Sequence, residues 1–553
     1  MRAMRRRLAI FSVLLLGCPK AIPDGRGEGP LSDGGNPEVE RLVARVDAID
    51  AEAGVVLAAL DDALWRHWTK GQNLELAKAT QGHEALFGLP TLEVLRRAQG
   101  LGVESRRAAH LERWILAQAL SRALESDTEA VASLEAGATF TLGEKEIPWR
   151  DLSRLLINEK SAVKRRALAA GAVSVAERLD GLLAHREDKT AELLAGLSAG
   201  SPSQLATATR EFDLDAMAAT AREVLSATDG TWKSTLQSLS ALELKLPLET
   251  LTKADLPRLL KVPASVDVAF PRTSVATRAI DTLAGLGLYG RPGLSLELSD
   301  GANKRPLPLT VAPSPKDVRV SYKPLGGLRD QTLLLSELGV ALALSAASTG
   351  HPSTDRLGDP ARGSALGALL SWLVMDPAWL SARGVTEAQQ PAVIRSARAL
   401  MLYSVRRAAL GVLLHAETVG LGDPEAKAAA VALEARALGV KVPLGEGASL
   451  RLELDDGLRS GTTLKAALAA AEVREQLGDR FWASPDAGQA LLARWAAGTS
   501  TELVVSSSDA LVRLLGVSAP SRAGGPTSVV DAGSVEPAGG IDGGAPDTGD
   551  AGR

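Results

Sequence analysis

The sequence predicts a mainly α-helical protein that carries one small antiparallel β element. Hydrophobic residues make up 45% of the chain but aromatic residues only 3%, so the core must consist mostly of Leu, Ala and Val. Apolar residues recur at helical spacing through most of the chain, whereas strand-like alternation is confined to residues 294–322. With 553 residues, the chain can form two or three domains or one large helical body.

The N-terminus has the pattern of a bacterial lipoprotein signal peptide. Residues 1–7 are basic, and residues 8–16 form an apolar run that is too short to span a bilayer as a mature helix. Leu15-Leu16-Gly17-Cys18 then matches a lipobox, and Cys18 is the sole cysteine of the chain. We therefore expect a signal peptide over residues 1–17 and a lipid on Cys18 that anchors the protein at the cell envelope, facing the periplasm or the outer surface. An ordinary signal peptide with a chance cysteine is the alternative.

Two further segments lack the composition of a folded core. Residues 18–38 are rich in Gly, Pro and Asp, which predicts a flexible linker behind the lipidated cysteine. Residues 517–553 are rich in Gly, Ala, Asp and Pro and contain no aromatic residue, which predicts a disordered tail. Between these segments, residues 39–516 are predicted to form one helical domain.

Five stretches of this domain show the clearest helical spacing of apolar residues, and good helix formers such as Ala, Leu, Arg and Glu dominate them. They are residues 43–60, 110–124, 152–183, 395–415 and 464–477. Each is therefore predicted to be a helix with one face toward the core.

A short region between these helices alternates as strands do. Three strand candidates are separated by turn signals at Ser299-Asp300-Gly301 and at Ala312-Pro313-Ser314-Pro315. The candidates are residues 294–298, 305–311 and 317–322. The sequence thus predicts a small antiparallel sheet directly before a helix that begins after Pro324-Leu325-Gly326-Gly327.

The charge pattern excludes one class of partner. The net charge is −4, and no long basic run follows the N-terminus, so the chain lacks the electrostatic pattern of a nucleic-acid-binding protein. None of the six histidines lies at metal-ligand spacing from another. Neither nucleic acid nor a histidine-based metal site is therefore expected.

The most informative stretch is Ser336-Glu337-Leu338-Gly339-Val340-Ala341, which has the frame of the H-E-x-x-H helix of zinc peptidases. Several neighbouring motifs keep a compatible order within residues 294–380: Pro315-Lys316-Asp317-Val318-Arg319-Val320, then Gly326, Gly327 and Asp330, then Leu357-Gly358-Asp359 and Asp376-Pro377-Ala378-Trp379-Leu380. In this order and spacing the chain resembles the thimet oligopeptidase and oligoendopeptidase F metallopeptidases, which are gluzincins.

The resemblance implies a two-lobed helical peptidase-like body with a deep channel and a zinc ion between two helices. It places the zinc ligands at Ser336, Val340 and Ser364 and the catalytic base at Glu337. Hydroxyls are poor zinc ligands and valine offers none, so all three ligand positions are degenerate. Without zinc there is no acidified water for Glu337 to deprotonate. We therefore expect no bound cofactor and no catalytic residue, with zinc lost.

The resemblance also implies a peptide-binding strand. It suggests that Val318, Val320 and Tyr322 line the channel, on a strand whose edge pairs with extended peptide. The chain is thus expected to be a lipid-anchored pseudopeptidase that binds peptides or serves as a scaffold, with peptides or an active peptidase relative as partners. Two alternatives remain open: an active metallopeptidase with non-standard ligands, such as His351 beside Glu337, and a structural helical lipoprotein of the envelope.

Overall fold

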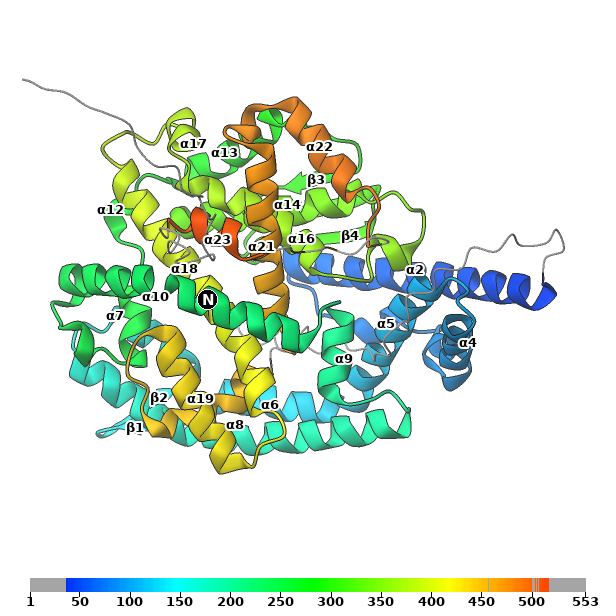
Figure 1. The fold of residues 1–553 in the computed structure, drawn as a ribbon, viewed down its shortest axis with the longest axis horizontal. Helices are drawn as coiled ribbons and strands as arrows, with labels where there is room; N and C mark the ends of the chain where they lie inside the picture. Colours follow the sequence, from blue (N-terminus) through cyan, green and yellow to red (C-terminus); the bar gives the residue numbers. More distant parts are fainter. Residues whose placement is uncertain (1–35, 456, 500–502, 504, 506, 517–553) are drawn as a thin grey trace, which may run out of the picture. The chain divides into compact units, whose positions relative to one another are not determined.

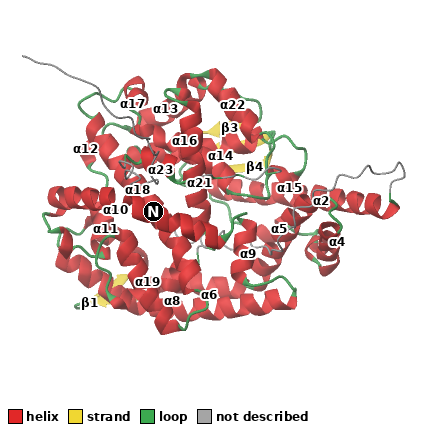
Figure 2. Ribbon diagram, in the orientation of Figure 1, coloured by secondary structure: helices red, strands yellow, loops and turns green. Residues whose placement is uncertain are grey.

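The computed structural model describes residues 36–455, 457–499, 503, 505 and 507–516. All of them belong to the first of two units, Met1–Val517 and Ser518–Arg553. The described residues are mainly helical with a few short strands (Figures 1 and 2), so the predicted fold class is confirmed at this level. The expected signal peptide, the lipid site Cys18, most of the linker and the tail of residues 517–553 lie outside the described residues.

The elements follow one another as the structure has them. The first part contains α2 (Pro37–Lys70), α3 (Leu76–Ala79), α4 (Leu89–Gly100), α5 (Ser105–Ala123), α6 (Glu125–Gly137), β1 (Thr139–Leu142), β2 (Lys145–Pro148), α7 (Leu152–Asn158), α8 (Ala162–Gly196), α9 (Pro202–Thr209), α10 (Leu214–Leu239), α11 (Leu256–Leu259), α12 (Ala264–Asp267) and α13 (Arg272–Gly285). The second part contains β3 (Leu294–Glu297), β4 (Leu309–Ser314), β5 (Asp317–Ser321), α14 (Leu328–Ala346), α15 (Pro352–Asp355), α16 (Ala361–Ser371), α17 (Pro377–Ala382), α18 (Gln390–Thr418), α19 (Asp423–Leu438), α20 (Leu450–Leu454), α21 (Arg459–Leu477), α22 (Pro485–Trp495) and α23 (Asp509–Leu514).

Four of the five predicted helices lie within or largely within α2, α5, α18 and α21. The fifth, residues 152–183, covers two helices, because α7 ends at Asn158 and α8 begins after its N-cap residue, Ser161. The side chain of Ser161 accepts a hydrogen bond from the backbone N–H of Lys164 and caps α8.

The first described helix, α2, begins at Pro37, inside the predicted linker. Asn36 caps this helix, and proline is favoured at the first helical position.

The three-stranded sheet has the order β3-β5-β4. β4 pairs antiparallel with β5, but β3 pairs parallel with it, so the predicted purely antiparallel sheet is wrong for β3. The reason is the connection after β3, which crosses to the far edge of β5 instead of turning back as a hairpin. The buried Nζ of Lys304 holds this crossing, because it donates to the carbonyls of Glu297 (2.6 Å), Ser299 (3.1 Å) and Tyr322 (2.8 Å).

The central position of β5 corrects the prediction of a peptide-binding strand. β3 and β4 occupy both of its edges, and the side chains of Val318, Val320 and Tyr322 are 0% exposed within the hydrophobic core. The Tyr322 hydroxyl donates a hydrogen bond of 2.5 Å to Asp330 Oδ2. Residues 318–322 therefore have no free edge for a peptide, and the side chains of Val318, Val320 and Tyr322 stabilise the core instead.

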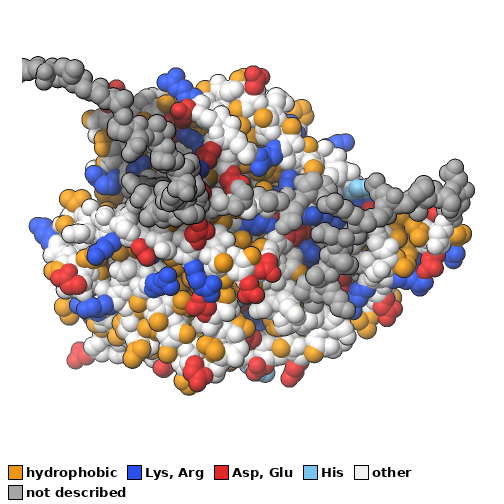
Figure 3. All heavy atoms as spheres, in the orientation of Figure 1, with side chains coloured by type: hydrophobic (Ala, Val, Ile, Leu, Met, Phe, Trp, Pro, Cys, Tyr) orange, Lys and Arg blue, Asp and Glu red, His pale blue; other side chains and the backbone are white. Residues whose placement is uncertain are grey.

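One described helix, α18, is long and apolar enough to cross a membrane. However, 67% of its most apolar stretch is buried inside the protein, where it packs against α10, α19 and α21. This burial is typical of a core helix. On the face shown in Figure 3, acidic and basic side chains of the described residues are interspersed with apolar ones, in keeping with the small net charge.

Candidate functional site

The helix that carries the peptidase-like frame, α14, leaves the sheet through a tight turn. Gly326 and Gly327 have φ values of +89° and +98°, and a Cβ on Gly326 would lie 2.9 Å from the backbone nitrogen of Arg272. The Oδ2 atom of Asp330 accepts hydrogen bonds from the backbone N–H groups of Leu325 (2.9 Å) and Gly326 (2.8 Å). The Gly-Gly-x-x-Asp part of the motif therefore sets the direction in which α14 begins.

Ser336 and Val340 share the face of α14 that packs on α16. A Cβ added to Gly367 would lie 3.0 Å from Ser336 Oγ and 3.4 Å from Val340 Cγ2, and one added to Gly363 would lie 3.6 Å from Val340 Cγ1. The neighbour of Gly363 is Ser364, the third degenerate ligand position. The structure thus places Ser336 and Val340 against the helix that carries Ser364.

The two helices approach so closely that their backbones touch. A Cβ on Gly339 would lie 2.4 Å from the carbonyl oxygen of Leu366 and 2.5 Å from the Cα of Gly367. Helices that pack through larger side chains usually keep their axes 8–10 Å apart. Glycines at 339 and 367 remove those side chains and allow direct backbone contact.

The side chains at the three positions do not fit a zinc ion. Zinc in proteins is bound by imidazole nitrogen, thiolate sulfur or carboxylate oxygen. Ser336 offers a neutral hydroxyl, Val340 a hydrocarbon, and the hydroxyl of Ser364 donates to the carbonyl of Pro360 in its own helix turn (3.1 Å). No group of three His, Cys, Asp or Glu side chains within the described ranges is arranged to hold a metal ion.

His351, the candidate for a non-standard ligand, lies in a different polar cluster. Its Nδ1 is 3.6 Å from Oδ2 of Asp50, a buried residue of α2. The same oxygen accepts hydrogen bonds from Arg107 (2.9 Å) and from the Ser353 hydroxyl (2.8 Å). The alternative of a zinc site on His351 and Glu337 therefore finds no complete ligand set in the described part of the chain.

Glu337, at the position of the catalytic base, contacts the outer edge of β4. Its backbone carbonyl accepts a hydrogen bond of 3.1 Å from the Thr310 hydroxyl. Burial raises the pKa of its carboxyl group, and hydrogen bonds from the side chain and backbone of Thr310 offset this only in part. A buried carboxyl group with a raised pKa can hold a proton, which makes Glu337 a candidate acid or base by chemistry alone.

A carboxylate on α2 caps the same strand. Oδ2 of Asp61, on α2, accepts the backbone N–H of Ala312 at 2.8 Å, two residues beyond Thr310. Asp61 also pairs with Arg356 at 2.8 Å, and burial raises the pKa of its carboxyl group. Edge strands expose unpaired N–H groups that can bind another strand, and caps of this kind block such pairing. A peptide that added to β4 along this edge would have to displace Asp61.

Sequence reasoning missed this capped edge. Asp61 lies 251 residues before Ala312, and no local pattern around Asp61-Asp62 signals such a contact. The frame on α14 was accessible to sequence reasoning because all its residues lie within two neighbouring helices.

Comparison with known proteins adds no relative: no model of a known protein family matches the chain, and no match is found among curated proteins. The resemblance to oligoendopeptidases therefore rests on the order and spacing of the motifs in the sequence.

Proposed function

We propose that this chain is a catalytically inactive relative of the oligoendopeptidases, held at the cell envelope by a lipid on Cys18, and that it acts by binding or as a scaffold. One observation carries the proposal: Ser336 and Val340 share a helix face that packs against the helix of Ser364, as ligand positions would, but none of the three can bind zinc. The two-lobed body that the resemblance implies is part of this proposal.

The surroundings of Glu337 fit a structural role better than a catalytic one. A gluzincin base works on water that a metal has acidified, and the degenerate positions do not supply that metal. The backbone carbonyl of Glu337 instead accepts a hydrogen bond of 3.1 Å from the Thr310 hydroxyl on the edge strand. Loss of Glu337 is thus expected to affect the packing of β4 on α14, without loss of any hydrolytic activity.

The partners that fit this proposal are peptides or an active peptidase of the same envelope. β5 cannot take up a peptide as an added strand, because both of its edges are occupied. Binding therefore has to use another surface of the protein.

The first test is the zinc content of the mature chain from Cys18, purified in detergent, loaded with zinc and dialysed. We expect a stoichiometry near zero and no chelator-sensitive hydrolysis of a mixed peptide substrate. One tightly held zinc per chain, or hydrolysis that a chelator stops, would overturn the proposal and support an active metallopeptidase.

A second test addresses the frame itself. The triple variant Ser336→His, Val340→His and Ser364→Glu restores the ligand types at all three positions, and we expect it to bind zinc. The double variant Ser336→His and Val340→His is the matched control, and it should bind zinc more weakly because it lacks the carboxylate. A triple variant that is folded by circular dichroism but binds no zinc would show that the frame is wrong and favour a structural lipoprotein.

A further inference from the structure

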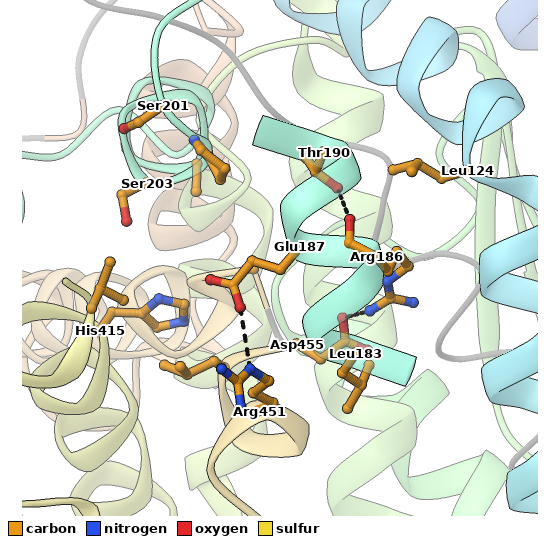
Figure 4. Close-up of a pocket in the computed structure, with 15 residues that line it drawn as sticks. Leu124, Leu183, Arg186, Glu187, Thr190, Ser201, Ser203, His415, Arg451 and Asp455 are labelled. Carbon is orange, nitrogen blue, oxygen red and sulfur yellow. Dashed lines mark hydrogen bonds and ion pairs between the residues drawn. The ribbon is translucent and has the colours of Figure 1, made fainter. Parts of the chain in front are cut away.

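A cavity of about 240 Å³ lies among α8, α9, α20 and the C-terminal end of α18 (Figure 4). Its walls are largely apolar and are formed by Leu124, Leu183, Ala206, Val419 and Leu454. An apolar cavity of about 150 Å³ is enough to hold one benzene ring, so this one can hold a somewhat larger group. None of its elements belongs to the α14–α16 site, and the inference drawn from it is independent of the proposed function.

Two arginines line the cavity, and both form ion pairs with carboxylates. Arg186 forms an ion pair with Asp455. Arg451 pairs with Asp423 at 2.6 Å and with Asp180 at 3.1 Å. These last two carboxylates are shared with a second cation, since Nζ of Lys427 lies 2.7 Å from Asp180 and 3.6 Å from Asp423. The three cations are thus matched by three carboxylates.

A fourth carboxylate, Glu187, brings the number of carboxylates above the number of these cations, and it also forms an ion pair with Arg451. Its Oε2 lies 3.5 Å from Nε of Arg451, and that nitrogen makes no hydrogen bond within the described residues. The side chain of Glu187 is 50% exposed, so it is available to a ligand. Figure 4 shows Glu187, Arg451 and the ring of His415 pointing toward one another beside the cavity.

We propose that this cavity binds a small apolar amine, with the ammonium group on Glu187 and the apolar body between Leu183 and Leu454. The excess carboxylate favours a cation over an anion, and the apolar walls favour a hydrocarbon body. Two sources share this chemistry: a free alkyl or aryl amine, and the α-amino end of a peptide whose first side chain is apolar.

The test is calorimetric titration of the full mature chain with hexylamine, hexanoate and hexanol, which differ only in the polar group. We expect hexylamine to bind most tightly of the three. The Glu187→Gln substitution should weaken hexylamine binding by about tenfold, since it removes the charge and keeps the shape of the side chain. The matched control is Glu177→Gln, an exposed position on α8 about 15 Å along the helix, which should leave binding unchanged.

Further arms separate the two sources and test the cavity itself. Binding of Leu-Gly-Gly but not of its N-acetylated form would identify a peptide amino end, whereas binding of hexylamine alone would identify a free amine. The Ala206→Leu substitution adds atoms to the wall of the cavity and leaves Glu187 unchanged, so it should weaken the binding of every ligand that occupies the cavity. The proposal is overturned if hexanoate binds as tightly as hexylamine, if Glu187→Gln and Glu177→Gln behave alike, or if neither amine nor peptide binds.

Discussion

At the scale of single residues, the carboxyl group of Glu337 is the one closest to peptidase chemistry, and its surroundings decide what it can do. Burial raises its pKa, which is a property shared by many catalytic acids and bases. The same burial arises when a helix packs on a sheet, and here α14 packs on β4, where the Thr310 hydroxyl donates to the backbone carbonyl of Glu337. Without metal-binding side chains at Ser336, Val340 and Ser364, the raised pKa is explained by packing alone.

The buried side-chain amide of Gln331 should destabilise the fold. Gln331 follows Asp330 on α14, is 0% exposed, and neither its amide nitrogen nor its amide oxygen has a hydrogen-bond partner among the described residues. A buried polar group without partners costs about 1–3 kcal/mol. We therefore expect Gln331→Leu, which keeps the volume and removes the polar atoms, to raise the free energy of unfolding by about 1–2 kcal/mol in urea titrations.

The matched control for this prediction is Gln237→Leu, at an exposed position on α10. It makes the same chemical change where water already satisfies the amide, so it should not stabilise the protein. Equal effects of the two substitutions would mean that the amide of Gln331 is satisfied in solution, for example by a buried water molecule.

At the scale of elements, the contact between α14 and α16 determines the candidate site. A Cβ at position 339 meets backbone atoms at 2.4–2.5 Å, whereas a Cβ at position 363 meets only Val340 Cγ1 at an ordinary 3.6 Å. We expect Gly339→Ala to push the helices apart and to lower the free energy of unfolding by about 2–3 kcal/mol. Gly363→Ala, the same change in the partner helix, should be neutral or stabilise by up to about 1 kcal/mol.

Thermal or urea unfolding of the two glycine variants side by side checks this prediction. Helix propensity favours alanine in both, so only the close approach at Gly339 can make them differ. A Gly339→Ala variant as stable as Gly363→Ala would mean that the helices are farther apart than the structure has them.

Elements also show what the sequence could predict. Helices such as α2, α5, α18 and α21 follow from apolar periodicity, because the period is a local property. The parallel pairing of β3 with β5 depends on the crossing held by Lys304, and strand propensity says nothing about such a partner. The β1–β2 hairpin, with Gly143 at φ +63° in its turn, was missed although Thr139–Leu142 is rich in β-forming residues.

Some features of the candidate site could be predicted from local sequence, and others depend on contacts between distant segments. The face shared by Ser336 and Val340 follows from the 3.6-residue period of one helix, so its position could be predicted. The caps on β4 and the occupied edges of β5 depend on contacts between segments far apart in the chain. For that reason Val318, Val320 and Tyr322 were expected to bind a peptide but are core residues.

At the scale of the whole unit, a buried polar cluster joins segments that are distant in sequence. Glu211, in the turn between α9 and α10, accepts a hydrogen bond from His110 of α5 at 2.7 Å and pairs with Arg106 at 2.7 Å. The backbone carbonyl of Glu211 accepts from Lys465 of α21 at 2.6 Å, and Lys465 pairs with the buried Asp359 at 2.8 Å. The charge state of this cluster should therefore influence the stability of the unit as a whole.

The lowered pKa of Glu211 should make the stability of the unit depend on pH. Burial alone would raise this pKa, but the hydrogen bond from His110 and the charges of Arg106 and Arg113 outweigh burial and lower the pKa from 4.5 to about 2. Because the folded pKa is depressed, this contribution to stability is present above about pH 4.5 and is lost as the pH falls toward 2. Between about pH 5 and pH 3 the loss from this group should be about 2 kcal/mol.

Urea unfolding of wild type and Glu211→Gln at these two pH values measures this contribution. The variant cannot gain a proton at position 211, so its free energy of unfolding should fall by about 2 kcal/mol less than that of wild type. Glu223→Gln, at an exposed position on α10, is the control and should keep the wild-type slope. If Glu211→Gln and wild type lose equal stability, the cluster does not hold Glu211 ionised, and acid unfolding must begin at other carboxylates.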